Sequence, residues 1–348
     1  MIQPLIVWYN NTMRENVPIS TLTTMRLGGP ASYVKEILDP RQLRDAYSFA
    51  KTNHLKVFIL GSGSNVIGLD DGFSGLILVN KIRGIEIQRE LAGEIIIKGG
   101  AGESLDKFIE FGTKRGYSGL EAMSAIPGTL GAAPVQNAGA YGQEISDVLV
   151  AIDIYDTKTG RFETIPANEI RFSYRRSIFN HGPSAGRYFI THVTVKLKKT
   201  QLSPPFYTSL QRYVDEHKIT DFSPNKIREI VTLIRADKLP DPTLIPSAGS
   251  FFKNIYLSDQ EADSAKAKGV EVWHENGKNI VNSGWLIEQA DLKGKLLHGI
   301  RVSDKAALIL INESAENYAD LTAARTEIIK TVKDKFGFTL EQEPIELK

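Results

Sequence analysis

The sequence contains no cysteine, which excludes disulfide bonds, thiolate metal sites and a flavin attached through cysteine. Its six histidines are scattered, with no pair at metal-ligand spacing on one helix or loop, so we expect no metal site. Met1 to Asn10 lacks the basic flank and long apolar run of a signal peptide, and no later apolar run could span a bilayer. We therefore expect a cytoplasmic protein without membrane insertion.

The sequence also has no excess of charge of one sign, because it contains 42 Lys and Arg residues and 41 Asp and Glu residues. A chain without a net field is not expected to bind nucleic acid or an anionic membrane, and its partners should be small molecules. At 348 residues, of which 42% are hydrophobic, it can build a large interior. Chains of this length usually divide, so we expect more than one domain.

Hydrophobic periodicity and turn residues predict an irregular alternation of helices and strands. The helix at 225–238 has a sharp predicted end because Pro240 and Pro242 follow it. The other predicted helices are 41–53, 104–115, 284–290 and 318–336. Predicted strands are 56–60, 75–80, 85–89, 94–98, 148–155, 161–165, 188–198 and 307–311, with 148–198 forming an antiparallel sheet and a short strand-like tail closing the chain.

Two glycine-rich loops are the main chemical signal. Residues 61–65, Gly-Ser-Gly-Ser-Asn, follow a predicted strand, and free backbone N–H groups in such a loop can approach a pyrophosphate. The loop lacks the third glycine of a Rossmann fingerprint, and on its own it could be a tight turn. The loop at 124–142 is rich in small residues and could accommodate a bulky planar ligand. The two loops together suggest a dinucleotide.

The order and spacing of these loops resemble the UDP-N-acetylenolpyruvoylglucosamine reductases, also called UDP-N-acetylmuramate dehydrogenases. The matching segments are 61–65, 126–131, 136–142, 174–177, 238–242, 248–254, 284–289 and 340–343. The resemblance implies an α+β fold, with a two-lobed FAD-binding domain of the vanillyl-alcohol-oxidase-like (PCMH) type and a C-terminal α+β substrate-binding domain. The expected boundaries are 1–78 and 338–348 for FAD lobe 1, 79–239 for FAD lobe 2 and 240–337 for the substrate-binding domain.

The resemblance also implies an activity, the NADPH-dependent reduction of UDP-N-acetylglucosamine enolpyruvate to UDP-N-acetylmuramate through non-covalent FAD, in peptidoglycan precursor synthesis. NADPH is carried over in this way, because no residue here separates it from NADH. The Phe206-Tyr207 segment resembles the longer type of the family, in which a tyrosine loop closes over the substrate. The residues expected to bind FAD are Gly61, Ser62, Gly63, Ser64, Asn65, Pro127, Gly128, Thr129, Gly131, Gln136, Asn137, Gly139, Ala140 and Tyr141.

Three residues match the catalytic positions of the family. Hydride addition to the alkene pushes negative charge into the adjacent carboxylate, so a cation and a hydrogen-bond donor must face that group. Arg175 matches the cation, and Arg176 beside it is expected in solvent. Glu343 matches an acid that must be protonated, which requires an apolar site. A register error of two residues would transfer that role to Glu341, and the family's usual Val-Arg after the glutamate is replaced here by Pro-Ile.

Ser250 matches the family's proton donor to carbon, a role in which a hydroxyl needs a neighbouring cation such as Lys253. A turn or helix-capping serine is the structural alternative. For the substrate, the resemblance points to Tyr174, Tyr207, Lys238, Asn254 and Gln289. Lys238 and Arg235 could instead complement the dipole of their own helix.

Two other functions remain open at this stage. An FAD-linked oxidase of the same fold would explain both glycine loops, but not Arg175, Ser250 and Glu343 together. A non-catalytic protein that binds a UDP-sugar or a flavin would retain binding without turnover.

Overall fold

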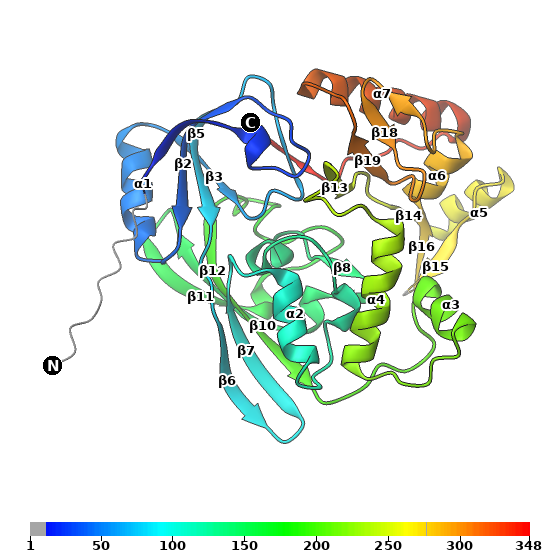
Figure 1. The fold of residues 1–348 in the computed structure, drawn as a ribbon, viewed down its shortest axis with the longest axis horizontal. Coiled ribbons are helices and arrows are strands. Elements are labelled where there is room, and N and C mark those ends of the chain that lie inside the picture. The colour runs from blue at the N-terminus through cyan, green and yellow to red at the C-terminus, as the bar shows by residue number, and fades with distance from the viewer. Residues whose placement is uncertain (1–11, 276) are drawn as a thin grey trace.

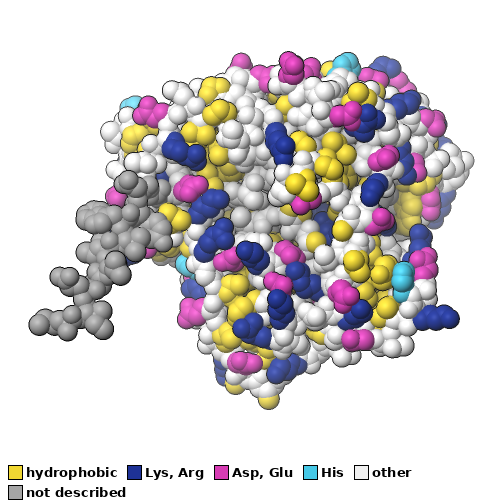
Figure 2. Space-filling model, viewed as in Figure 1, with side chains coloured by type: hydrophobic (Ala, Val, Ile, Leu, Met, Phe, Trp, Pro, Cys, Tyr) yellow, Lys and Arg dark blue, Asp and Glu magenta, His cyan; other side chains and the backbone are white. Residues whose placement is uncertain are grey.

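The computed structural model describes residues 12–275 and 277–348, so the prediction made for Met1 to Asn10 lies outside the described residues. Two β-sheets make up the N-terminal two thirds of the molecule, and a smaller group of strands and helices follows beside them (Figure 1). No helix in the described ranges is long and apolar enough to cross a membrane. On the face seen in Figure 2, basic and acidic side chains are interspersed rather than segregated.

The first sheet has four strands in the order β1-β2-β5-β3. β1 and β2 are antiparallel, whereas β2 and β3 both run parallel to β5. Helix α1 connects β2 to β3, and Leu43, Ala46 and Ala50 on its apolar stripe pack against the sheet. The elements are β1 (Arg14–Pro18), β2 (Pro30–Ile37), α1 (Gln42–Thr52), β3 (Lys56–Leu60) and β5 (Phe73–Asn80).

The second sheet has five strands in the order β11-β10-β12-β7-β6, and every neighbouring pair is antiparallel, as the sequence predicts for its central part. Its core includes Phe108 and Ile109 of α2, a helix that begins after Ser104, whose side chain caps the Lys107 N–H. The elements are β6 (Ile85–Leu91), β7 (Glu94–Gly100), α2 (Leu105–Thr113), β10 (Leu149–Asp156), β11 (Arg161–Pro166) and β12 (Tyr188–Lys198).

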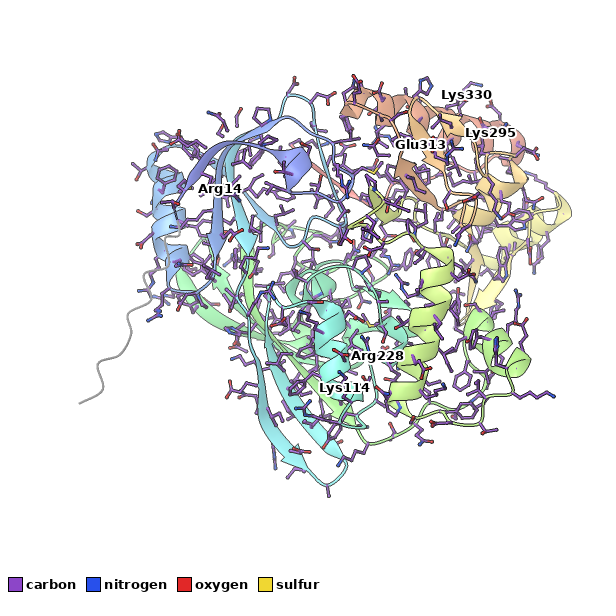
Figure 3. All side chains as sticks on the ribbon, in the orientation of Figure 1. Arg14, Lys114, Arg228, Lys295, Glu313 and Lys330 are labelled. Carbon is purple, nitrogen blue, oxygen red and sulfur yellow. The ribbon has the colours of Figure 1, made fainter. Side chains whose placement is uncertain are left out.

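Helices α3 (Thr208–Glu216) and α4 (Pro224–Lys238) follow the second sheet and share a small apolar cluster. α4 starts at Pro224 behind the capping side chain of Ser223, within a residue of the predicted start. Arg228 on α4 faces α2 (Figure 3), and its two terminal nitrogens lie 2.5 Å and 2.8 Å from the two oxygens of Asp106. This bidentate pair fixes α4 beside the second glycine loop.

The C-terminal part is built on two small sheets, β13-β19-β18-β17 and β14-β16-β15. Its longest helix, α7, is capped by Asn317 and ends at Gly337, which has a left-handed backbone with φ 79°. The elements are β13 (Ser247–Ser250), β14 (Ile255–Leu257), α5 (Asp259–Ala267), β15 (Trp273–Glu275), β16 (Lys278–Val281), α6 (Ser283–Gln289), β17 (Leu296–Leu297), β18 (Ile300–Val302), β19 (Ile309–Asn312) and α7 (Tyr318–Phe336).

The C-terminal part does not have a core to itself. Met25, Leu27 and Ile67, all from the N-terminal part of the chain, are buried in the same apolar cluster as α6 and α7. The last strand, β20 (Ile345–Leu347), runs back and pairs in parallel with β4 (Val66–Gly68), directly after the first glycine loop. The chain end is therefore held beside that loop.

The burial of Leu347 should make this return contact measurable. Leu347 is fully buried in the cluster of the first sheet, whereas Ile345 on the same strand is 40% exposed. Replacing Leu347 with Ala should lower the free energy of unfolding by about 2–3 kcal/mol, because a buried leucine loses its transfer energy and leaves a cavity. Urea unfolding of Leu347→Ala, with Ile345→Ala as the matched control, measures this. Equal losses in the two variants would contradict the anchoring role of Leu347.

Candidate active site

The first glycine loop, residues 61–65, follows β3 and is held open by its backbone conformation. Gly63 has φ 73°, and a Cβ atom there would lie 2.0 Å from the Leu22 carbonyl oxygen, so only glycine fits. The N–H groups of residues 62–64 have no hydrogen-bond acceptor among the described residues. Consecutive free N–H groups form an anion-binding concavity, which suits the diphosphate of a dinucleotide.

The second glycine loop lies directly against the first. The Ser64 hydroxyl donates to the Pro127 carbonyl at 3.1 Å, and Asn65 Nδ2 donates to Gln136 Oε1 at 2.7 Å. A Cβ atom on Gly61 would lie 2.7 Å from Thr129 Oγ1, so the backbone of the first loop lies close against the Thr129 side chain of the second. The predicted loops therefore form one continuous surface of small residues.

The remainder of the second loop is an ordered segment with its own hydrogen bonds. Asn137 Nδ2 donates to Glu144 Oε2 at 2.6 Å, and β8 (Gly139–Ala140) pairs with β9 (Gln143–Glu144). Tyr141 closes the loop and packs edge-on against Tyr207, with ring centres 5.7 Å apart. Asn137 and Tyr141 both have positive φ, a conformation that costs energy in residues other than glycine.

Tyr174 and Arg175 occupy the tip of a tight turn. Ser173 and Arg176 exchange two backbone hydrogen bonds of 3.0 Å across it, and Arg175 has φ 55° at the position where such a turn usually has glycine. The Asn180 side chain donates to the Arg175 carbonyl at 3.1 Å and reinforces the turn. The backbone thus holds the arginine in a strained conformation.

The C-terminal segment brings Glu343 to this turn. The Glu343 N–H donates to the Phe251 carbonyl at 2.9 Å, and the Lys253 N–H donates to the Glu341 carbonyl at 2.8 Å. Residues 341–343 therefore lie as a short strand beside residues 251–253. Glu343 Oε1 lies 3.0 Å from Arg175 Nε, and both side chains are largely buried.

Glu343 and Glu341 have opposite surroundings. Glu341 is mostly exposed and pairs with Lys253 at 2.5 Å. Burial raises the pKa of Glu343 above its ordinary value, although the charges of Arg175 and Lys253 work against this. Of the two glutamates weighed from the sequence, only Glu343 lies in the environment that a protonated acid requires.

Arg175 has a hydrogen-bond donor that no described residue uses. Burial by itself would lower the pKa of Arg175, but the Glu343 carboxylate and Tyr174 outweigh it, so the pKa is raised and the guanidinium stays charged. Although Nε is close to Glu343, its N–H is not aligned with that oxygen, and this buried atom has no hydrogen-bond partner in the described part of the chain. A buried donor without an acceptor is costly and is suited to meet a ligand acceptor.

Ser250 ends β13, one residue before the carbonyl that binds the Glu343 N–H. It is half-buried, and its hydroxyl has no hydrogen-bond partner among residues 12–275 and 277–348. It neither caps a helix nor closes a turn through its side chain. Lys253, the cation expected beside it, is paired with Glu341 here.

A small hollow next to this group contains two of the predicted substrate residues, Tyr207 and Asn254. The Asn254 N–H donates to the Tyr174 hydroxyl at 3.2 Å, which connects the hollow to the turn that carries Arg175. Its lining residues are Tyr207, Thr208, Asn254, Trp273, Ile280 and Asn282. Sequence reasoning missed Thr208, Trp273 and Asn282; the position of Asn282 just before the Gly-Trp motif of α6 was the available signal.

Two predicted substrate residues lie apart from the hollow. Lys238 is the last residue of α4 and Gln289 the last residue of α6, and both side chains are exposed. Arg235, on the same helix, is partly buried, and its Nε donates to the Ala125 carbonyl at 3.3 Å. Arg235 therefore supports the second glycine loop and is more than a complement to the helix dipole.

Comparisons with known proteins agree with this arrangement. Residues 31–165 match the FAD binding domain family, and residues 241–347 match the family "UDP-N-acetylenolpyruvoylglucosamine reductase, C-terminal domain". A UDP-N-acetylenolpyruvoylglucosamine reductase of Pseudomonas putida is 33% identical over 334 residues, which cover 95% of this chain and 98% of that protein. One of Burkholderia orbicola is 34% identical over 336 residues, covering 94% and 95%.

A solved structure shows the same fold. The UDP-N-acetylenolpyruvylglucosamine reductase of Thermus caldophilus superposes with a TM-score of 0.65 at 24% identity, over 97% of this chain and all of that one (100%). The first family match covers most of the two large sheets, without β1 and β12, and the second covers the C-terminal part. The fold class predicted from the sequence is confirmed.

The close approach at Gly63 gives a test of flavin binding. Gly63→Ala should lower the amount of FAD that co-purifies with the protein several-fold, because the new Cβ must displace the loop backbone away from Leu22. Gly93→Ala is the matched control, since Gly93 also has positive φ but a Cβ there would meet no atom within 4 Å. Visible absorbance per protein gives the FAD content. A Gly63→Ala protein with full FAD content would remove this loop from the cofactor site.

Proposed function

The chain belongs to the UDP-N-acetylenolpyruvoylglucosamine reductase family, and from this we propose that it uses NADPH and bound FAD to reduce UDP-N-acetylglucosamine enolpyruvate to UDP-N-acetylmuramate. The observation that carries the proposal is the buried Arg175–Glu343 contact beside two adjoining glycine loops. Peptidoglycan precursor synthesis is the process that this reaction serves, and the cytoplasmic location expected from the sequence is part of the proposal.

The two glycine loops fit the cofactor. Residues 62–64 offer N–H groups without an acceptor among the described residues for the diphosphate, and the second loop has no aromatic side chain from Pro127 to Ala140. FAD in this site supplies a two-electron carrier that accepts hydride from NADPH and delivers hydride to the alkene. The FAD-binding lobes proposed from the sequence contain these loops, and the proposed substrate-binding domain starts at Pro240.

Arg175 is proposed to bind the substrate carboxylate. Its guanidinium is charged and buried, and its Nε–H is without a partner in the described residues, so a carboxylate acceptor would complete its bonding. Because the turn at Ser173 and Arg176 fixes the backbone, the cation is in place before the ligand arrives. Preorganised charge of this kind stabilises the anion that develops as hydride adds.

Glu343 is proposed to be the neutral donor to the same carboxylate region. A protonated carboxyl can donate a hydrogen bond to developing negative charge, whereas a carboxylate would repel it. The raised pKa of Glu343 supports this assignment, and burial is its largest cause. Arg175 and Glu343 then act as one unit, in which the first offers charge and the second a proton.

Ser250 is proposed to give the proton to the carbon next to the new C–H bond. Its free hydroxyl, half-buried one residue from the Glu343 anchor, supports the role. The UDP portion would occupy the hollow at Tyr207 and Asn254, with Tyr174 joining the two regions through its hydroxyl. Lys238 and Gln289 remain proposed contacts that require closure of the Tyr207 segment, since both are exposed here.

Separate half-reactions test the function directly. Under anaerobic conditions NADPH should remove the flavin absorbance band, and UDP-N-acetylglucosamine enolpyruvate should restore it. In the Ser250→Ala variant, NADPH should remove the flavin band at the wild-type rate. The substrate should restore the band roughly 10²–10⁴-fold more slowly than in wild type, because only this second step needs the proton. Stopped-flow absorbance measures both steps. A wild-type band that returned with oxygen alone would identify an oxidase, and undiminished recovery in Ser250→Ala would remove this residue from the chemistry.

The pKa of Glu343 predicts a pH dependence. If the protonated form is required, the recovery step is fast below the raised pKa and slows as pH rises through it. The stability contribution has the same sign, because a carboxyl with a raised folded-state pKa stabilises the protein at low pH and loses that effect as pH rises. Glu343→Gln should be roughly 10²-fold slower at low pH and should lack the alkaline fall.

Glu341→Gln is the matched control, since Glu341 lies two residues away and is mostly exposed. It should keep the alkaline fall of the wild type. A Glu341→Gln variant that lost the fall, with Glu343→Gln retaining it, would transfer the acid role to Glu341.

A further inference from the structure

Gln136 connects the first glycine loop to the acid of the site. Its Oε1 accepts a 2.7 Å hydrogen bond from Asn65 Nδ2, and its Nε2 donates to Glu343 Oε1 at 3.4 Å. It follows the short 3₁₀ helix Leu130–Val135 and is half-buried. A residue expected from the sequence to contact only the cofactor therefore also contacts the proposed catalytic acid.

The two oxygens of Glu343 have different surroundings. Oε1 is approached by Gln136 Nε2 at 3.4 Å and by Arg175 Nε at 3.0 Å. Oε2 makes no hydrogen bond to any residue in the part of the chain that the structure describes. An oxygen that accepts the Gln136 N–H and lies 3.0 Å from a nitrogen of the Arg175 cation acts as an acceptor and is a poor place for a proton.

We propose that Gln136 is a positioning residue that holds the proton of Glu343 on Oε2, the oxygen without a hydrogen-bond partner among the described residues. This inference rests on the proposed function, because it concerns the same acid. With Oε1 bound to the Gln136 N–H and close to the Arg175 cation, the O–H of Glu343 on Oε2 is left for the ligand. Without Gln136 the proton could occupy either oxygen, and part of the population would present the wrong one.

The orientation of the Gln136 amide is fixed at both ends. The reverse orientation would place its carbonyl oxygen beside Glu343 Oε1, an oxygen that already faces the Arg175 cation as an acceptor. It would also turn the amide nitrogen toward the Asn65 amide nitrogen. With both amides in these orientations, Asn65, Gln136 and Glu343 form one chain of contacts that begins in the first glycine loop.

The test is Gln136→Met, which keeps the length of the side chain and removes both hydrogen bonds. Gln143→Met is the matched control, because Gln143 lies in the same region and its Oε1 accepts from the Ala122 N–H, without a contact to Glu343. Both variants are compared with wild type in three measurements, namely FAD content, the rate of the NADPH step, and the rate of the substrate step as a function of pH.

Gln136→Met should slow the substrate step about 2- to 10-fold at low pH, the equivalent of one hydrogen bond, and leave the NADPH step unchanged. Its alkaline fall should move to higher pH, because a lost donor to Oε1 disfavours the charged form of Glu343. The same substitution in a Glu343→Gln background should have little further effect, since the two residues act together.

A Gln136→Met protein with lower FAD content or a slower NADPH step, but an unshifted alkaline fall, would overturn the inference and leave Gln136 as a cofactor contact. If Gln143→Met had equal effects, the Gln136→Met result would reflect only the stability of the loop, and this outcome would also overturn the inference. A wild-type protein whose flavin band did not return with the sugar nucleotide would contradict the proposed function, and the inference with it.

Discussion

The contact between Arg175 and Glu343 is the interaction on which the site depends, because it joins three distant segments in one buried place. The turn at 173–176, the strand-like segment 341–343 and residues 251–253 meet there. Removing two ionisable groups from water is unfavourable unless their bonding is complete. Here it is incomplete, since a buried arginine N–H has no acceptor among the described residues and the glutamate pKa is raised. The pair is arranged for a ligand more than for stability.

Contacts around the site keep this energetically unfavourable arrangement in place. β20 is fixed against β4, and Arg325 and Tyr318 on α7 both bind Glu346 in the same strand. On the other side, Arg175, Asn137 and Tyr141 keep left-handed backbones, which cost roughly 1–3 kcal/mol each. Strain of this size persists only where neighbouring hydrogen bonds enforce it. The strain at these three residues lies in the second loop and the turn, close to the Arg175–Glu343 pair.

Much of the fold could be predicted, and the failures have physical causes. Strand β3, strand β12 and helix α7 have the predicted limits, because their periodicity is strong and their ends carry clear signals. Helix α3 and strand β1 were missed, since both are short and only two residues of α3 and one of β1 are buried. The family resemblance supplied Arg175, Glu343 and Ser250. The resemblance assigned the C-terminal tail to the first lobe. Neither periodicity nor resemblance could show that β20 pairs with β4 there or that Gln136 touches Glu343, because such contacts join residues far apart in sequence.

The central claim is that Glu343 is kept protonated by burial while a cation lies beside it. An infrared titration that follows the carbonyl band of a protonated carboxyl group, assigned by its loss in Glu343→Gln, measures this directly. The band should persist to a pH clearly above the ordinary titration range of glutamate and vanish as pH rises further. A Glu343 that titrates within or below the ordinary range would contradict the account, because the buried pair would then be a plain salt bridge.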